Sequence, residues 1–405
     1  MKKFRKVLAL CLALVLVVGC FAACGEKTPD DKPDDAVAVK VGFIFLHDEQ
    51  STYDKNFMDA AKAACKEMGV EYAQKTQIPE SKDCYDAAVE LVEVDGCNII
   101  FADSFGHESF LIDAAKKYPD VQFCHATGTQ AHTAGVPNFH NAFASIYQGR
   151  YLAGVAAGLK LNEMIDAGKI TADKAKMGYV GAFTFAEVMS GYTSFYLGAK
   201  SVCPTVTMDV KFTGSWYDEQ LEKEAAQALI AGGCVLISQH ADSEGAPKAC
   251  EEKKVPNVAY NIDTSSMGPN TALISSKINW SPYYELAITA VAKGEEFATD
   301  WCGTLATGSV QLTKLNEAVA AEGTQAALDE AISKLEKGEL KVFDTATFTV
   351  DGKALESYKA DVIPDEKFEK DTEVIKDGVF CESDVDGMRS APYFDIMYID
   401  GISEK

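Results

Sequence analysis

Apolar and polar positions alternate between strand-like and helix-like stretches over most of the 405 residues. The runs Val37 to Leu46 and Cys97 to Ala102 are mostly apolar, and both predict buried strands. Between them, residues 54–68 and 81–94 place apolar side chains at helical spacing. Strands that alternate with helices of roughly 12 to 15 residues are typical of parallel α/β layers.

The same order of elements recurs later in the chain. The stretch GCNIIFADSFG begins at Gly96, and the similar GCVLISQHADSEG begins at Gly233, 137 residues later. The first strands repeat as well, because Gly42 in VGFIFLHD and Gly178 in MGYVGAFT are 136 residues apart. The agreement of the two offsets predicts two similar α/β lobes.

Length supports two lobes, because about 380 residues remain after the N-terminal region and a single core rarely exceeds about 250–300 residues. We expect an N-terminal lobe over residues 37–145, completed by about 272–300. The C-terminal lobe then covers 146–271 and is completed by part of 301–405. We assign no chemistry to the acidic region from Glu322 onward.

The N-terminus has the organisation of an export signal. Lys2, Lys3, Arg5 and Lys6 precede an apolar run that is shorter than the roughly 20 residues of a membrane span. The run ends at Phe21-Ala22-Ala23-Cys24, which resembles the lipobox of bacterial lipoproteins. We therefore expect residues 1–23 to be a signal peptide and Cys24 to carry lipid, with Cys20 as the second candidate and ordinary cleavage without lipid as a third. Residues 24–36 are polar and proline-containing, as in a flexible tether on the outer face of the cell membrane.

Charge narrows the classes of ligand. Loss of the four basic residues of the signal takes the formal charge from −23 to −27, and only Arg150 and Arg389 remain as arginines. An acidic, arginine-poor surface repels anions, which argues against nucleic acid, anionic lipid headgroups and nucleotides as ligands.

Nine cysteines follow Cys24, and an odd number cannot all pair. We expect most to be small buried side chains, with one or two disulfides left open.

Two α/β lobes predict a cleft at the carboxyl ends of their strands. The loops expected there are rich in aromatic and neutral or acidic polar side chains, which suit a flat heteroaromatic ligand. Taken singly, each aromatic side chain also fits core packing. The candidate ligand-binding residues are Tyr53, Asn56, Phe57, Ser104, Phe105, Phe183, Trp216, Asp242, Asn261, Asp263 and Trp280.

Several short segments stand out in the second half of the body, namely GYVGAF from Gly178, SWYD from Ser215, QHADS from Gln239, YNID from Tyr260 and NWSPYY from Asn279. Earlier in the chain are SFG from Ser104, YPDV from Tyr118 and GRYLAG from Gly149. Together these segments resemble the basic membrane protein (BMP) family of substrate-binding lipoproteins of ABC transporters. The resemblance runs from about Val39 to Val310.

This resemblance implies a type I periplasmic-binding-protein fold, with two Rossmann-like lobes that close on a ligand about a hinge of three crossing segments. It places stacking aromatics at Trp216 and at Tyr53 or Phe57. Its polar ligand-binding positions fall on Asn56, Asp242 and Asp263, with Asn261 nearby. Where many nucleoside binders have Asp-Asp…Phe-Asn after the first strand, this chain has HDEQ…NF at residues 47–57. That departure leaves nucleoside, free base or another solute such as a sugar open.

Other classes fit less well. Residues 102–106 and 241–245 each approach the G-x-S-x-G nucleophile elbow of hydrolases but lack its first glycine. His125, His132 and His140 are seven and eight residues apart, which matches no helical pair of metal ligands, so we expect no metal and no cofactor. We predict a solute-binding protein that takes up a nucleoside or purine base and docks on a membrane permease, and that is not an enzyme. A lipoprotein that senses a ligand and signals to a receptor is the alternative.

Overall fold

The computed structural model describes residues 38–362, 370–383 and 389–405. The expected signal peptide, the tether and Cys24 lie outside these ranges and stay predictions. Residues Ala38–Lys405 form one unit. Within the described ranges, we find no helix with the length and apolar character needed to cross a bilayer.

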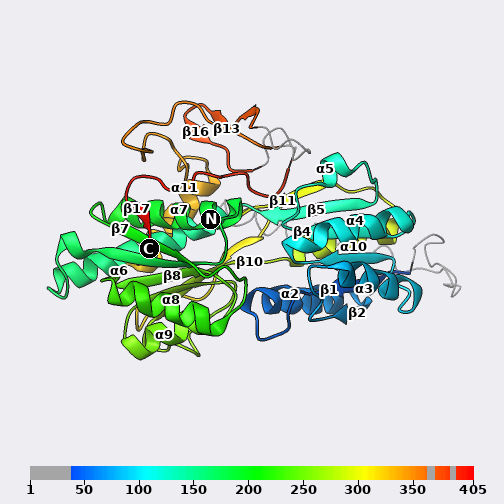
Figure 1. The fold of residues 1–405 in the computed structure, drawn as a ribbon, viewed down its shortest axis with the longest axis horizontal. Coiled ribbons are helices and arrows are strands. Elements are labelled where there is room, and N and C mark those ends of the chain that lie inside the picture. Colours follow the sequence, from blue (N-terminus) through cyan, green and yellow to red (C-terminus); the bar gives the residue numbers. More distant parts are fainter. Residues whose placement is uncertain (1–37, 363–369, 384–388) are drawn as a thin grey trace, which may run out of the picture. The chain divides into compact units, whose positions relative to one another are not determined.

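The first lobe is built on a six-stranded sheet in the order β11-β5-β4-β3-β1-β2, in which every neighbouring pair is parallel. One face packs against α2 and α10, and the other packs against α3 and α4 (Figure 1). The strands are β1 (Lys40–Ile44), β2 (Glu71–Lys75), β3 (Ile99–Ala102), β4 (Gln122–Ala126), β5 (Phe139–Ala144) and β11 (Asp300–Gly303). The helices are α2 (Thr52–Met68), α3 (Lys82–Glu93), η1 (Phe105–His107), α4 (Glu108–Lys117), α5 (Ala131–Ala134) and α10 (Ser281–Lys293).

The second lobe has a seven-stranded sheet in the order β12-β10-β9-β8-β6-β7-β17, with only its edge strand β12 antiparallel to its neighbour. Helices α6, α7 and α11 cover one face, and α8 and α9 cover the other. The strands are β6 (Lys176–Gly181), β7 (Thr207–Phe212), β8 (Leu236–His240), β9 (Asn257–Tyr260), β10 (Ala272–Ile278), β12 (Val310–Leu312) and β17 (Ile402–Glu404). The helices are α6 (Ile146–Asp166), η2 (Ala172–Lys174), α7 (Ala186–Val202), α8 (Glu219–Ala231), α9 (Gly245–Lys253) and α11 (Thr324–Glu336).

The two sheets share one strand order. In the first, β1 lies between β2 and β3 and is followed outward by β4 and β5. In the second, β6 lies between β7 and β8 and is followed by β9 and β10. The repeated sequence segments correspond to β1 and β6 and to β3 and β8, so the repeat in the sequence is a repeat in topology.

The chain passes between the two sheets three times, at residues 145, 279–280 and 304–309. We expected residues 272–300 to complete the first lobe, and α10 and β11 do lie there. Strand β10 instead pairs with β9 in the second sheet, where Leu273 and Ile274 join the core. The second crossing therefore comes after Ile278, later than expected.

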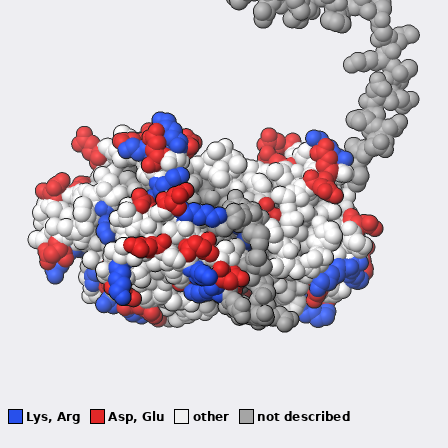
Figure 2. All heavy atoms as spheres, turned by 90° about the horizontal axis from the view of Figure 1, so that it is seen from above, with Lys and Arg blue, Asp and Glu red and all other residues white. Residues whose placement is uncertain are grey.

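The described parts of the C-terminal segment, residues 343–362, 370–383 and 389–405, pack mainly on the second lobe. It contains the short strands β13 (Lys359–Ala360), β14 (Thr372–Glu373), β15 (Ile375–Lys376) and β16 (Val379–Phe380), and it ends with β17 beside β7 (Figure 1). Phe343, Phe380 and Phe394 join the core of the second lobe. The segment also reaches the first lobe, where the Ser390 amide and hydroxyl donate to Asp300 Oδ1 at 2.9 and 2.8 Å. Acidic and basic side chains are interspersed on the face that carries it (Figure 2).

Candidate functional site

A pocket lies where the carboxyl ends of strands from both sheets meet, as expected for parallel α/β lobes. Its cavity has a volume of only about 10 Å³, roughly the space of one water molecule. Residues that follow β1, β3 and β4 line it on the first lobe, and residues at the ends of β6, β7 and β8 line it on the second. They are Leu46, Tyr53, Ser104, Phe105, Thr127, Glu187, Trp216, His240 and Asp242.

On the first lobe, two lining residues use their hydroxyl groups for internal hydrogen bonds. The Tyr53 hydroxyl donates to the Asp103 carbonyl at 2.8 Å, and the Ser104 hydroxyl donates to Glu80 Oε1 at 2.6 Å. Burial, together with nearby carboxylates, holds the pKa of Tyr53 well above its usual value. Tyr53 and Ser104 are therefore fixed in place before any ligand binds.

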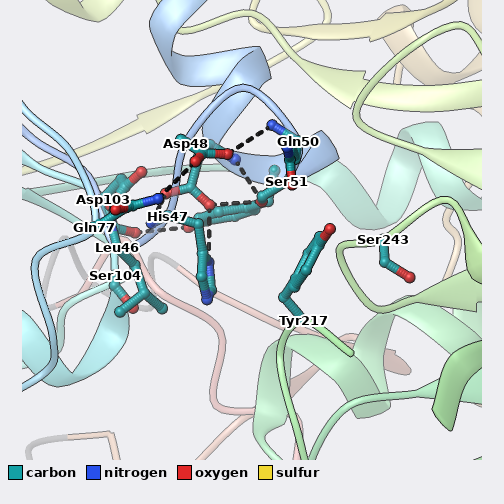
Figure 3. Close-up of polar contacts among 12 residues, drawn as sticks. Leu46, His47, Asp48, Gln50, Ser51, Gln77, Asp103, Ser104, Tyr217 and Ser243 are labelled. Carbon is teal, nitrogen blue, oxygen red and sulfur yellow. Dashed lines mark hydrogen bonds and ion pairs between the residues drawn. The ribbon is translucent and has the colours of Figure 1, made fainter. Parts of the chain in front are cut away.

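The loop after β1 is held by two buried carboxyl groups. Burial works to raise the pKa of Asp54, but hydrogen bonds from His47 and Ser51 outweigh it and the pKa is lowered. Burial first, and then the charge of Asp54, raises the pKa of Asp103 well above its usual range. The buried pair therefore favours the ionised form at Asp54 and the protonated form at Asp103. The loop in turn meets the second lobe, since the rings of His47 and Tyr217 lie 5.3 Å apart (Figure 3).

Aromatic rings join the two lobes at the pocket. Phe185 stacks on Trp216, with ring centroids 5.7 Å apart and planes 26° apart, and Phe183 meets Trp216 edge-on at 5.1 Å. Phe105 of the first lobe lies 5.0 Å from Phe185. These four residues form the aromatic cluster, in which Phe105 and Trp216 line the pocket.

Ionisable groups line the second-lobe side, where His240 and Asp242 are buried and Glu187 is partly buried. Burial raises the pKa of Glu187 to about 7, and it raises the pKa of Asp242 well above its usual value. Burial and the charge of Arg150 hold the pKa of His240 well below its usual value, so His240 is neutral. Arg150 is itself buried. Its guanidinium lies 3.4 Å from the centre of the Tyr260 ring and donates to the Gln239 carbonyl.

A backbone hydrogen bond also links the lobes beside the pocket. The Thr52 amide, at the start of α2, donates to the Asp242 carbonyl at 2.7 Å. The lobes are therefore in direct contact at two places, through this bond and through the aromatic cluster. This is the arrangement of a closed cleft.

Five of the eleven candidate residues come together at the pocket, namely Tyr53, Ser104, Phe105, Trp216 and Asp242. Phe183 lies behind Trp216. Asn56, Phe57 and Trp280 are packed in the interior instead. The Asn56 amide donates to the Ile278 carbonyl at 2.7 Å, and Phe57 stacks on Trp280 with ring centroids 4.4 Å apart.

The last two candidates lie away from the pocket. Asp263 is exposed, and its carboxylate accepts from the Ser265 amide in a separate surface hollow. Asn261 is buried in the left-handed conformation, with φ of 71°. Neither residue lines the pocket, and the Asn261 Nδ2 is buried without a hydrogen-bond partner among the described residues.

Four lining residues were not among the candidates. Leu46, Glu187 and His240 fall in loops that the sequence places at the cleft, but their residue types gave no reason to select them. Thr127 follows β4, and the only feature of the sequence that could have drawn attention to it is the glycine that comes next. Across the described ranges, no set of three or more His, Cys, Asp or Glu side chains is arranged to hold a metal ion.

The comparisons with known proteins agree with this architecture. A family model described as ABC transporter substrate-binding protein PnrA-like, abbreviated Bmp, matches residues 44–342. A purine-binding protein of Brucella abortus is 33% identical over 261 residues, which cover 63% of this chain and 69% of that protein. A proposed glucose-binding protein of an ABC transporter from Haloferax volcanii is 28% identical over 301 residues, which cover 73% of this chain and 72% of that protein.

Solved structures support the fold. A solute-binding protein of an ABC transporter system from Aeropyrum pernix superposes with a TM-score of 0.64 at 17% identity, covering 75% of this chain and 92% of that chain. A second solute-binding protein, from Conexibacter woesei, superposes with a TM-score of 0.61 at 20% identity, covering 75% of this chain and 98% of that chain. The predicted α/β type I solute-binding fold is thereby confirmed.

Proposed function

Because this chain belongs to the Bmp family of PnrA-like ABC transporter substrate-binding proteins, we propose that it captures a purine base or nucleoside between its lobes for an importer. Proteins of this kind bind a small molecule and deliver it to a membrane permease, and they are not enzymes. The observation that carries the choice of ligand is the pocket itself, which combines the aromatic cluster with buried carboxyl groups.

The aromatic side of the pocket suits a flat base. Stacking on an aromatic side chain contributes about 1–3 kcal/mol per base. Trp216 is the ring best supported for this role, because it lines the pocket and Phe185 and Phe183 fix its orientation. The cavity of about 10 Å³ leaves room for little more than one water molecule, so the lobes must open to admit a base or nucleoside.

The polar side disfavours a phosphorylated ligand. Phosphate groups are bound by Arg, Lys or backbone amides, but the charged residues that line this pocket are Glu187 and Asp242. Arg150 does not line the pocket; its guanidinium stacks on Tyr260, and its Nη1 donates to the Gln239 carbonyl. Protonated or ionised carboxyl groups can instead pair with the ring nitrogens and amino groups of a purine.

A sugar is the second candidate ligand, favoured by the relative from Haloferax volcanii. Carboxyl groups beside an aromatic ring also suit sugar hydroxyls. A thermal-shift screen of protein stripped of bound ligand separates the two. A ligand at 100 times its dissociation constant adds about 2.7 kcal/mol, which raises Tm by several degrees for a body of this size.

In that screen, we expect purine bases or nucleosides to raise Tm while glucose, other sugars and amino acids do not. A Trp216→Ala variant that keeps its own cooperative transition serves as the control and should show a smaller shift at the same ligand concentration. A shift with glucose and none with purines would reject the purine proposal and favour the sugar.

We also propose that Cys24 anchors the protein to the outer face of the cell membrane. Support comes from the basic, apolar and small-residue order of residues 1–24. Expression of the full chain with a radiolabelled fatty acid should give a labelled protein in the membrane fraction. Cys24→Ser should abolish the label, and persistence of the label would move lipidation to another residue such as Cys20.

A further inference from the structure

We propose that the Thr127 hydroxyl is the side-chain hydrogen-bonding group with which the first lobe recognises the ligand. This inference rests on the proposed function and names a specificity residue within the same pocket. Three residues with hydroxyl groups line the first-lobe side, namely Tyr53, Ser104 and Thr127. The hydroxyls of Tyr53 and Ser104 donate to Asp103 and Glu80. Among the residues that the structure describes, no partner is bonded to the Thr127 hydroxyl.

The backbone of Thr127 is unusual in a way that points to function. Its φ is 68°, in the left-handed region, although Thr is β-branched and strongly disfavours that region. Its amide donates to the Ala142 carbonyl at 3.1 Å, and only 4% of its surface is exposed. Strained residues of this kind persist where the surrounding structure enforces them, and they concentrate at ligand sites.

A buried carboxylate enforces the conformation. Glu108 Oε1 accepts from the amides of Thr129 and Gln130 at 2.7 and 2.8 Å and from the Asn141 side chain at 3.0 Å. Its Oε2 accepts from the Gln130 side chain at 3.0 Å. The turn that follows Thr127 is thus tied to the start of α4 by three hydrogen bonds to one side chain, and Asn141 of β5 adds a fourth.

Gly128 completes this support. A Cβ atom there would lie 2.4 Å from Glu108 Oε1 and 2.4 Å from His125 Nδ1, so only glycine lets the turn approach so closely. His125 in turn bonds the Ser104 carbonyl through Nε2 at 2.7 Å. His125, two residues before Thr127, thus ties β4 to the Ser104 segment, while Glu108 holds the turn on the other side of Thr127.

The chemistry of the opposite wall explains why a hydroxyl is useful here. The second lobe contributes the carboxyl groups of Glu187 and Asp242, whereas a hydroxyl can donate and accept at once. Thr127 can therefore pair with a ring nitrogen, a carbonyl or a ribose hydroxyl of the proposed ligand. We infer that Thr127 discriminates between ligands by the polar edge that they present to the first lobe.

The test is a titration calorimetry series on ligand-stripped full-length protein with the purine that gives the largest thermal shift. Thr127→Val keeps the branched shape and the backbone strain but removes the hydroxyl. We expect its Kd to rise about 5- to 150-fold, the usual effect of leaving a buried polar atom unpaired. Thr127→Ser, which keeps the hydroxyl, should stay within about threefold of wild type. Thr193→Val, a buried threonine on α7 whose hydroxyl also lacks a partner, should leave Kd unchanged.

An unchanged Kd in Thr127→Val, with wild type binding the purine, would overturn the inference while the proposed function stands. Absence of purine binding by wild type would instead reject the proposed function.

The positioning role of Glu108 has its own test. Glu108→Gln should weaken binding, and the double variant with Thr127→Val should be no weaker than Thr127→Val alone, because both act through one hydroxyl. Additive effects would show that Glu108 supports the fold without positioning Thr127.

Discussion

Replacement of Trp216 by Ala tests how the pocket holds a flat ligand. The substitution removes the ring that lines the pocket and stacks on Phe185 at 5.7 Å. Loss of one base-stacking contact is worth about 1–3 kcal/mol, so Kd should rise about 5- to 150-fold. The Phe183 and Phe185 contacts are lost as well, which should lower the free energy of unfolding by about 1–3 kcal/mol.

The two effects are separated by measuring them on the same samples. Titration calorimetry at 25 °C gives Kd, and urea denaturation without ligand gives the free energy of unfolding. Trp301→Ala is the matched control, because Trp301 packs on Tyr283 in the first lobe and does not line the pocket. We expect Trp301→Ala to lose stability without losing affinity. A Kd for Trp216→Ala within twofold of wild type would refute the stacking role.

Three further outcomes follow from the structure. The pKa of Glu187 is raised from 4.5 to about 7, so between these pH values the native state holds a proton that the unfolded chain releases, and stability falls as pH rises. Glu187→Gln should therefore gain up to about 3 kcal/mol relative to wild type between pH 4.5 and 8, and a pH-independent difference in urea denaturation would contradict this. Asp300→Ala leaves the Ser390 amide unpaired and should cost about 1–3 kcal/mol in the same assay, whereas no loss would mean that this link is not stabilising. Phe57→Leu disturbs the stack on Trp280 and should lower Tm while Kd stays within twofold, and a large rise in Kd would return Phe57 to the site.

Much of the fold could be predicted because the sequence carries strong periodic patterns. The expected helix over 54–68 is α2, Thr52–Met68, and the expected helix over 81–94 is α3, Lys82–Glu93, capped by Ser81. The repeat offset matched β1 with β6 and β3 with β8. The prediction that residues 272–300 complete the first lobe was wrong for β10, which pairs with β9 in the second sheet. The pattern was ambiguous there, because an apolar strand next to a crossing can pair in either sheet.

The site was harder to predict, since sequence pattern locates loops but not side-chain directions. Tyr53 and Phe57 are four residues apart on α2 and share one face, yet only Tyr53 lines the pocket while Phe57 packs on Trp280. Thr127 depends on a backbone conformation that is fixed by Glu108, 19 residues earlier in the chain. Such a contact between distant residues leaves no local trace in the sequence.

The central claim, purine capture at this pocket, can be measured through Trp216 itself. The chain has three tryptophans, so Trp280→Phe with Trp301→Phe leaves Trp216 as the only indole. Titration of this ligand-stripped variant with a purine nucleoside or base should give a saturable change in fluorescence with one site per chain, and glucose should give none. A folded variant whose fluorescence responds to glucose, or to none of these compounds, would contradict the account.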